Sequence, residues 1–338
     1  DLIYCENGEY QFIPSKMIHD HEPHGDLSIS EIFIHSSNIG ITKVVSQLGA
    51  EHIYDYARKF GFGIQTGIPL PSEASGVLRP YSKWSRLSGS SVSMGQEISV
   101  NTLQLALAYS AAANGGYLPN ARIIKNMSGK DFEGRNFTSR PVRQIMSPET
   151  SHLLLEMMED VVNRGTASKA RIPGFRIGGK TGTAEKFIDG EYSKRDFISS
   201  FAAVFPIDSP QYVCVISVDS PQYGYHWGNE TAAPIVKEIF ERIIINNSMD
   251  PIKSQHISQY EQETPGYYVS DLRRNTALIP QKMPNSLGRV LKQSLRLAKL
   301  TEIAIPSVVT SRRVVLRSVS PGMQVQNNAT YQIKFESI

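Results

Sequence analysis

The chain has 338 residues, 40% hydrophobic and 20% charged, so it is long enough to bury one sizeable core and to carry one further small domain. Its formal net charge of +3 comes from 35 basic residues scattered among 32 acidic ones, and without a basic run we expect no nucleic-acid partner. Cys5 and Cys214 are far apart in sequence, which favours free thiols, and no stretch is long and apolar enough to span a bilayer.

Residues 1–25 are rich in histidine, proline and glycine and predict an irregular segment. His19, Asp20, His21 and His24 are close enough in sequence to suggest a metal site. Their spacing matches no fixed helical or knuckle pattern of metal ligands, so we expect a solvated loop and no bound metal.

Two helices are predicted after Ser28, because apolar residues recur at helical spacing on both sides of Ser36-Ser37-Asn38. Serine and asparagine favour caps and turns, so helix capping alone would explain the residue types at this junction. A third helix is expected over residues 51–60, followed by a loop rich in glycine and proline that reaches Pro80.

The middle of the chain predicts one apolar core helix between polar segments. This helix is expected over residues 103–113, with Thr102 as its cap and Asn114-Gly115-Gly116 at its end. Strands are expected over residues 117–127 and 141–146, on either side of a polar surface loop at residues 128–140.

Ser147-Pro148-Glu149 is a start signal for the next helix. The apolar face of this helix is expected to contain Leu153, Leu154, Met157, Met158 and Val161.

The pattern of residues 176–218 predicts a β-sheet. Strands are expected over residues 176–184, 197–205 and 212–218, with a charged hairpin-like loop at residues 186–196 and a closing helix at residues 232–245. This order of helices and strands predicts an α+β fold in which an antiparallel sheet is flanked by helices.

The strand at residues 176–184 concentrates small residues around one cation, Lys180. Glycine inside a strand marks close approach by another backbone or by a ligand. Thr181 and Thr183 supply hydroxyl groups and the strand supplies N–H groups, so the stretch could hold a carboxylate beside a developing oxyanion, as acyl transfer requires. The alternative is a tight strand end with a solvated lysine, because a Lys-Thr-Gly triplet arises by chance in roughly a few per cent of chains this long.

Two short motifs together carry a more specific signal. Ser-x-x-Lys, Ser-Asp-Asn and Lys-Thr-Gly are shared by penicillin-binding proteins and class A β-lactamases, and Ser36-Ser37-Asn38 and Lys180-Thr181-Gly182 correspond to the second and third. Further matches are Phe60-Gly61-Phe62-Gly63 and Ser93-Met94-Gly95-Gln96. From residue 1 to about residue 246, the chain resembles a class B penicillin-binding protein, a peptidoglycan D,D-transpeptidase of the cell-division and elongation group.

The chain departs from this family in two places. No lysine follows a serine by three positions, so the motif that holds the nucleophile and its first base is missing. We therefore expect a C-terminal portion of a longer protein that does not acylate by itself. Glu97 stands where family members often have glycine, which puts the local loop conformation in question.

The resemblance implies roles for the residues that are present. Ser36, Asn38 and Lys180 would be catalytic: Ser36 would relay a proton toward the leaving amine with support from Lys180, and Asn38 would bind the substrate amide. Ser37, Thr181, Gly182 and Thr183 would bind substrate, with the two threonines on its terminal carboxylate and the Thr183 N–H in the oxyanion hole. No cofactor and no metal are implied.

Three segments are expected: a transpeptidase domain over residues 1–246, a polar linker over residues 247–275, and a small βαββ domain over residues 276–338. The last segment resembles a PASTA domain through Met283-Pro284-Asn285 and Ser320-Pro321-Gly322. A generic surface domain without a ligand is the alternative.

Partners and location follow only from the family. It implies peptidoglycan stem peptides as substrate, β-lactam antibiotics as inhibitors, divisome or elongasome membrane proteins and a glycosyltransferase as partners, and an N-terminal anchor on the outward face of the bacterial cytoplasmic membrane. Two other functions stay open: a D,D-carboxypeptidase or β-lactamase-like hydrolase, and a non-catalytic divisome scaffold or cell-wall-binding protein.

Overall fold

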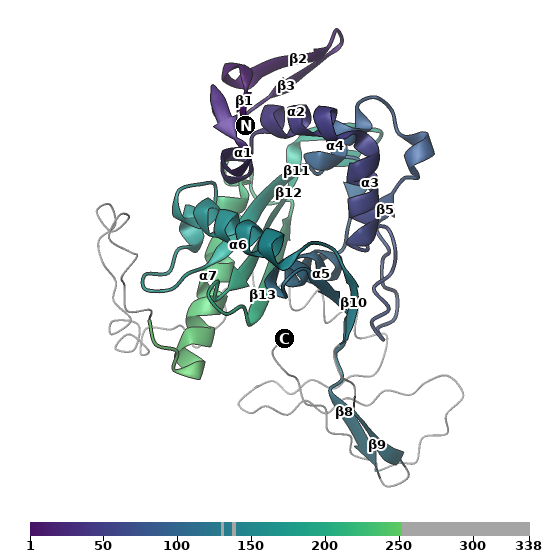
Figure 1. Ribbon diagram of the computed structural model, residues 1–338, viewed down its shortest axis with the longest axis vertical. Helices are drawn as coiled ribbons and strands as arrows, with labels where there is room; N and C mark the ends of the chain where they lie inside the picture. Colours follow the sequence, from purple (N-terminus) through teal and green to yellow (C-terminus); the bar gives the residue numbers. More distant parts are fainter. Residues whose placement is uncertain (130–131, 137–139, 252–338) are drawn as a thin grey trace. The chain divides into compact units, whose positions relative to one another are not determined.

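The computed structural model describes residues 1–129, 132–136 and 140–251 (Figure 1). The described residues fall into two units, one containing residues 1–120 and 141–251 and the other containing residues 121–129, 132–136 and 140. The linker expected over residues 247–275 lies outside the described residues from residue 252 onward, as does the whole PASTA-like domain expected over residues 276–338. Both therefore stay predictions.

A three-stranded antiparallel sheet forms the centre of the first unit, in the order β11 (Gly178–Ile188), β12 (Glu191–Phe205) and β13 (Tyr212–Asp219). Asp189 and Gly190 join the first two strands, with φ of 52° and 92°. Positive φ at both positions is the geometry of a two-residue hairpin turn, for which Asp-Gly is a preferred sequence. A hairpin is present at residues 186–196 as predicted, but its loop is shorter than predicted, because both strands continue to this two-residue turn.

Helices cover both faces of the sheet (Figure 1). α7 (Gly228–Asn247) packs on one face, where the Phe240 ring lies 4.9 Å from that of Phe205. α5 (Thr102–Ala113) and α6 (Pro148–Asn163) pack on the other face, toward which the alternation of β12 directs Val204. The predicted α+β fold class is confirmed.

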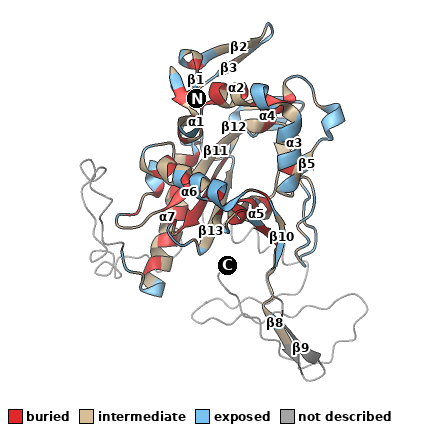
Figure 2. Ribbon diagram, in the orientation of Figure 1, coloured by how far each residue is buried: buried red, intermediate tan, exposed pale blue. Residues whose placement is uncertain are grey.

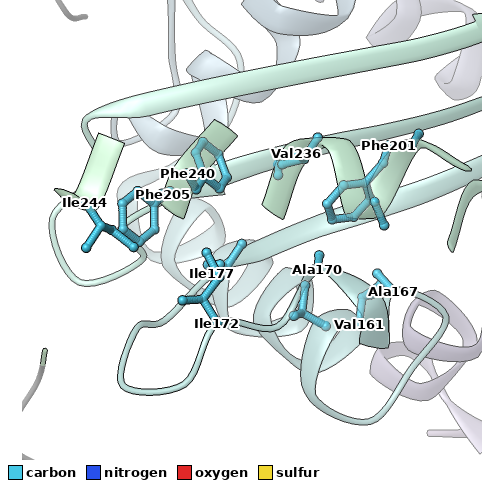
Figure 3. Packing of buried hydrophobic residues seen from close by; sticks show 14 of the residues in the cluster. Val161, Ala167, Ala170, Ile172, Ile177, Phe201, Phe205, Val236, Phe240 and Ile244 are labelled. Atoms are coloured by element: carbon cyan, nitrogen blue, oxygen red, sulfur yellow. The ribbon is translucent and has the colours of Figure 1, made fainter. Parts of the chain in front are cut away.

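The largest hydrophobic core lies between β12, α7 and the segment after α6, which contains the short 3₁₀ helix η3 (Ser168–Ala170) (Figure 3). Figure 2 shows buried residues along α7 and α5. The side chains labelled in Figure 3 are Val161, Ala167, Ala170, Ile172, Ile177, Phe201, Phe205, Val236, Phe240 and Ile244.

The first 28 residues form two small strand pairs. The prediction of an irregular segment over residues 1–25 is therefore wrong. β1 (Leu2–Tyr4) pairs with β4 (Asp26–Ser28), and β2 (Glu9–Ile13) pairs with β3 (Lys16–His19). A 3₁₀ turn, η1 (Glu6–Gly8), precedes β2. The polar and apolar residues of Glu-Tyr-Gln-Phe alternate along β2, and this period of two outweighs the loop-like composition.

The three predicted helices follow as α1 (Ile29–His35), α2 (Asn38–Leu48) and α3 (Ala50–Lys59). Ser28 and Glu31 form a capping box at the start of α1. The next segment contains α4 (Ser88–Ser93), the 3₁₀ turn η2 (Tyr81–Lys83), and the pair β5 (Val77–Leu78) and β6 (Ile98–Ser99).

The cap of α5 differs from the prediction. Asn101, rather than Thr102, caps this helix: its side chain accepts a hydrogen bond from the Gln104 N–H at 2.7 Å, and the Gln104 side chain accepts one from the Asn101 N–H at 2.8 Å. Thr102 is the first residue of the helix, because this reciprocal pair requires asparagine at the cap and glutamine three positions later.

The strands after α5 are shorter than predicted. β7 (Tyr117–Pro119) pairs with β10 (Pro141–Gln144). In the second unit, β8 (Asn126–Gly129) and β9 (Phe132–Asn136) form an antiparallel hairpin where a surface loop was predicted. Here pairing between neighbouring segments overrides polar composition as the determinant of structure.

The buried face of α6 also differs. Leu155, Met158, Val161 and Val162 are buried, whereas Leu153 is 58% exposed. Leu153, Leu154 and Leu155 are consecutive and cannot all face the core, because successive residues of a helix point in different directions. α7 begins at Gly228, four positions before its predicted start.

We expect Phe240→Ala to lower the free energy of unfolding by about 3–5 kcal/mol, because it leaves a cavity against Phe205 in the main core. Urea unfolding of the chain measures the change. Leu153→Ala on the exposed side of α6 is the control, with an expected change within about 0.5 kcal/mol. Equal effects of the two substitutions would contradict this description of the core.

Candidate active site

The junction of α1 and α2 holds Ser36 in a left-handed conformation, with φ of 60°, which residues other than glycine rarely adopt. The Ser36 N–H reaches the carbonyl oxygens of Ile32 and Phe33, and the Ser37 N–H donates to the carbonyl of Ile32 at 3.0 Å. α1 therefore ends here and the chain turns directly into α2. The exposed hydroxyl of Ser36 lies at this turn.

β11 brings Lys180 to this hydroxyl. Lys180 Nζ donates a hydrogen bond to Ser36 Oγ at 2.8 Å, across 144 positions of sequence. The neighbouring strand excludes a side chain at Gly179, because its Cβ would lie 2.6 Å from the carbonyl oxygen of Ala202. A Cβ at Gly182 would lie 2.6 Å from Ser200 Oγ, so a side chain there would displace that hydroxyl. The structure thus brings together the two motifs that the sequence analysis paired.

Burial lowers the pKa of Lys180 to about 8. The ammonium group also lies 5.9 Å from the centre of the Phe33 ring, a contact that favours the charged form. At neutral pH most molecules therefore carry the ammonium form. A lysine in this range can attract an anion and also exchange a proton at modest cost.

Thr181 and Thr183 share the face of β11 opposite Lys180. Thr181 Oγ1 lies 2.7 Å from Thr166 Oγ1, and Thr183 Oγ1 accepts a hydrogen bond from the Gly228 N–H at 3.2 Å. Gly228 begins α7, so the positive end of a 20-residue helix meets this strand. Hydroxyl groups beside a helix N-terminus are suited to a carboxylate.

Ser37 and Asn38 have local partners. Ser37 is only 2% exposed, and its hydroxyl donates to Asp20 Oδ2 at 2.6 Å and accepts from the Gly40 N–H at 2.9 Å. The side chain of Ser37 therefore faces the interior as the cap of α2, which argues against the substrate contact expected for it. Asn38 Nδ2 donates to the carbonyl of His19 at 2.9 Å, which leaves its Oδ1 for a ligand.

β11 is an edge strand of the described sheet, since its one strand neighbour is β12. An extended peptide can add to such an edge through main-chain hydrogen bonds. Along this edge it would meet Lys180 and Ser36. The arrangement is therefore suited to acyl transfer on an extended peptide that ends in a carboxylate.

The family model for the penicillin binding protein transpeptidase domain matches residues 2–241. The chain belongs to this family. It is 33% identical over 282 residues to stage V sporulation protein D of Bacillus subtilis, and 31% identical over 273 residues to the peptidoglycan D,D-transpeptidase FtsI homolog of Mesostigma viride. The matches cover 80% and 74% of this chain but 44% of each relative, so the chain spans less than half the length of these two relatives.

Solved structures agree with this assignment. The transpeptidase domain of penicillin-binding protein 3 from Burkholderia pseudomallei is 30% identical, with a TM-score of 0.66 over 75% of this chain and 74% of that one. Penicillin-binding protein 3 from Mycobacterium tuberculosis in complex with ampicillin is 29% identical, with a TM-score of 0.68 over 76% of this chain and 58% of that one. The likeness supports the α+β transpeptidase architecture.

The sequence analysis did not assign roles to four residues at the candidate active site. Phe33 lies under the Lys180 ammonium, Thr166 and Gly228 bond the two threonines of β11, and Asp20 binds Ser37. Gly165-Thr166 directly follows α6, which was a usable signal. The other three residues are recognised only once the chain is folded.

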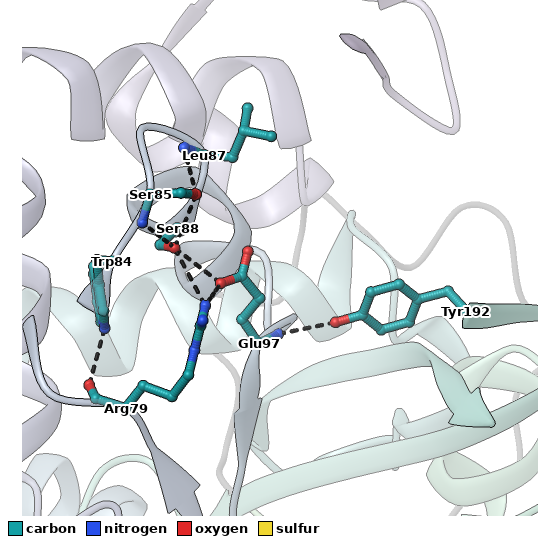
Figure 4. A network of polar contacts seen from close by, with 7 residues as sticks. All are labelled: Arg79, Trp84, Ser85, Leu87, Ser88, Glu97 and Tyr192. Carbon is teal, nitrogen blue, oxygen red and sulfur yellow. Dashed lines mark hydrogen bonds and ion pairs between the residues drawn. The ribbon is translucent and has the colours of Figure 1, made fainter. Parts of the chain in front are cut away.

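Glu97 adopts the left-handed conformation, φ 57°, that its glycine-like position requires. Its carboxylate accepts from Ser88 Oγ at 2.9 Å and pairs with Arg79, and its N–H donates to Tyr192 Oη at 3.2 Å (Figure 4). Glutamate is therefore tolerated here with compensating contacts. These contacts join the loop after α4 to the β11–β12 hairpin.

Three other sequence expectations concern chemistry outside the site. Cys5 and Cys214 are both free thiols, as predicted. Over residues 1–129, 132–136 and 140–251, no group of side chains has the arrangement of a metal site. None of the helices in that part of the chain has the length and apolar character needed to cross a membrane.

We expect the Lys180 amine to react with an acylating reagent with a half-maximal rate near pH 8, because burial disfavours its ammonium form. The free energy of unfolding should rise with pH between about 8 and 10.5, since the unfolded chain binds the proton more tightly over that range.

Mass spectrometry of pH-dependent acetylation measures the first effect, with N-acetyl-lysine amide as the reference for an ordinary side chain of pKa about 10.4. A Lys180 profile that superimposes on the reference would contradict the assigned environment.

Proposed function

We propose that this chain supplies the proton-relay and carboxylate-binding parts of a serine D,D-transpeptidase that cross-links peptidoglycan during cell-wall synthesis and division. The contact between Lys180 Nζ and Ser36 Oγ at the free edge of β11 carries the proposal. Membership of the transpeptidase family and the names of relatives such as the D,D-transpeptidase FtsI homolog support it.

The reaction proposed is acyl transfer from a stem peptide that ends in D-Ala-D-Ala. A serine from a Ser-x-x-Lys motif, which these 338 residues do not contain, attacks the penultimate carbonyl, and the bond to the terminal D-alanine breaks as its amine takes a proton. An acceptor amine then attacks the ester, which forms the new amide and restores the serine.

Each site residue has a defined role in this proposal. Ser36 relays the proton to the leaving amine, and Lys180 orients that hydroxyl and attracts the substrate carboxylate. Thr181 and Thr183 bind the carboxylate at the positive end of α7, and the Thr183 N–H stabilises the oxyanion. Asn38 binds the peptide amide through its free oxygen.

The absence of a side chain at Gly182 lets the peptide approach β11. Ser37 takes no direct part, because its hydroxyl is occupied by Asp20 and Gly40.

β-Lactam antibiotics resemble the D-Ala-D-Ala end and are proposed as inhibitors, with support from the ampicillin and aztreonam complexes of penicillin-binding protein 3. We further propose the outward face of the bacterial cytoplasmic membrane as the location. Divisome or elongasome membrane proteins and a glycosyltransferase are the proposed partners.

We expect a protein that carries this chain together with its Ser-x-x-Lys segment to form a covalent adduct with fluorescent penicillin. Lys180→Ala should lower the second-order rate of labelling by about 100-fold or more, because it removes the group that orients Ser36 and attracts the carboxylate. Stopped labelling reactions resolved on gels measure the rate.

Lys186→Ala is the matched control. Lys186 lies on the same strand as Lys180, but its ammonium group pairs with Asp219 and not with Ser36. The Lys186→Ala protein should therefore be labelled at a rate within about threefold of wild type. No adduct with the wild-type protein would overturn the proposed function, and equal rates for the two variants would overturn the role of Lys180.

A further inference from the structure

Asp20 lies against the turn that contains the proposed proton relay. One oxygen, Oδ2, accepts from the Ser37 hydroxyl at 2.6 Å, and the other, Oδ1, accepts from the Ile39 N–H at 3.0 Å. The Ile39 N–H is among the first amides of α2, which have no partner inside the helix. A carboxylate at this end of a helix is also stabilised by the helix dipole.

The main chain that carries Asp20 is itself anchored. The Asp20 N–H donates to the carbonyl of Gly8 at 3.1 Å, and the carbonyl of His19 accepts from Asn38 Nδ2 at 2.9 Å. Ser37, Asn38 and Ile39 therefore all bind the His19-Asp20 dipeptide. This dipeptide joins β3 to the strained turn at Ser36 through side-chain and main-chain contacts.

We propose that Asp20 is a positioning residue for acyl transfer, which it serves by holding Ser36 in the left-handed conformation opposite Lys180. The inference rests on the proposed function of Ser36. Asp20 holds the segment that directly follows Ser36, because its carboxylate binds both the Ser37 hydroxyl and the Ile39 N–H at the start of α2. Without it, the Ile39 N–H loses its acceptor and the buried Ser37 hydroxyl keeps only the weaker acceptor Cys5 Sγ at 3.5 Å, so the turn can relax away from positive φ.

Carboxylate geometry, rather than charge, is the property that this role requires. Asparagine keeps one carbonyl oxygen for the Ile39 N–H, and its amide N–H can donate to Ser37 Oγ while the Ser37 hydroxyl donates to Cys5 Sγ, which lies 3.5 Å away, so Asp20→Asn should preserve the turn. Alanine removes both acceptors. Glu22, an exposed acid two positions later, is the matched control, because Glu22→Ala removes the same charge from the same segment.

The test uses the protein that carries this chain with its Ser-x-x-Lys segment, and it separates the affinity for fluorescent penicillin from the rate of acylation. We expect Asp20→Ala to lower the acylation rate roughly 10- to 100-fold with little change in affinity, because Ser36 is displaced while the groups on β11 are not. Asp20→Asn and Glu22→Ala should stay within about threefold of wild type. Ser37→Ala should add little to Asp20→Ala, since both remove the same contact.

Hydrogen exchange at the Ile39 amide gives a second readout that does not depend on labelling. Protection should be lost in Asp20→Ala and retained in Asp20→Asn. An acylation rate for Asp20→Ala close to wild type, with only a lower melting temperature, would overturn the positioning role, as would unchanged protection of Ile39. Failure of the wild-type protein to label would instead count against the proposed function.

Discussion

The hydrogen bond from Lys180 Nζ to Ser36 Oγ is the interaction on which the organisation of the site depends. It joins the helical segment that contains α1 and α2 to the central sheet, so that the Ser36 hydroxyl from one part meets the Lys180 ammonium from the other. Because the half-buried lysine lies against Phe33, its ammonium form interacts strongly with whatever lies beside it. The distance between α1 and β11 therefore determines both the orientation of the hydroxyl and the electrostatic environment of a bound peptide.

Close packing around small residues makes this distance possible. A Cβ at Gly40 would lie 2.5 Å from Ile32 Cγ1, so α2 approaches the end of α1 only because this position is glycine. A Cβ at Gly228 would lie 2.5 Å from the carbonyl oxygen of Ser200, and the same reasoning applies to the contact of α7 with the sheet. These glycines have a steric role, and they bring the start of α7 to Thr183 and the turn at Ser36 to Lys180.

The elements with strong periodic patterns could be predicted from the sequence, and so could the pairing of Ser36 with Lys180. α1, α2 and α3 follow the helical spacing of their apolar residues, and Ser36 and Lys180 were paired through motifs. The direction of the Ser37 side chain could not be predicted, because its motif is compatible with a substrate contact or a helix cap. Only the packing of the His19-Asp20 dipeptide against α2 decides between them.

Composition was a poor guide where local alternation and tertiary pairing compete with it. The first 25 residues have the histidine, proline and glycine content of a loop, yet two strand pairs form there and orient the Asp20 carboxylate toward α2. A carboxylate that satisfies a buried hydroxyl and a helix amide stabilises one conformation of a turn more strongly than surface contacts would. The positive φ of Ser36 is costly by itself and needs such contacts around it. A segment without any group for the chemistry can therefore determine how well the chemical groups are aligned.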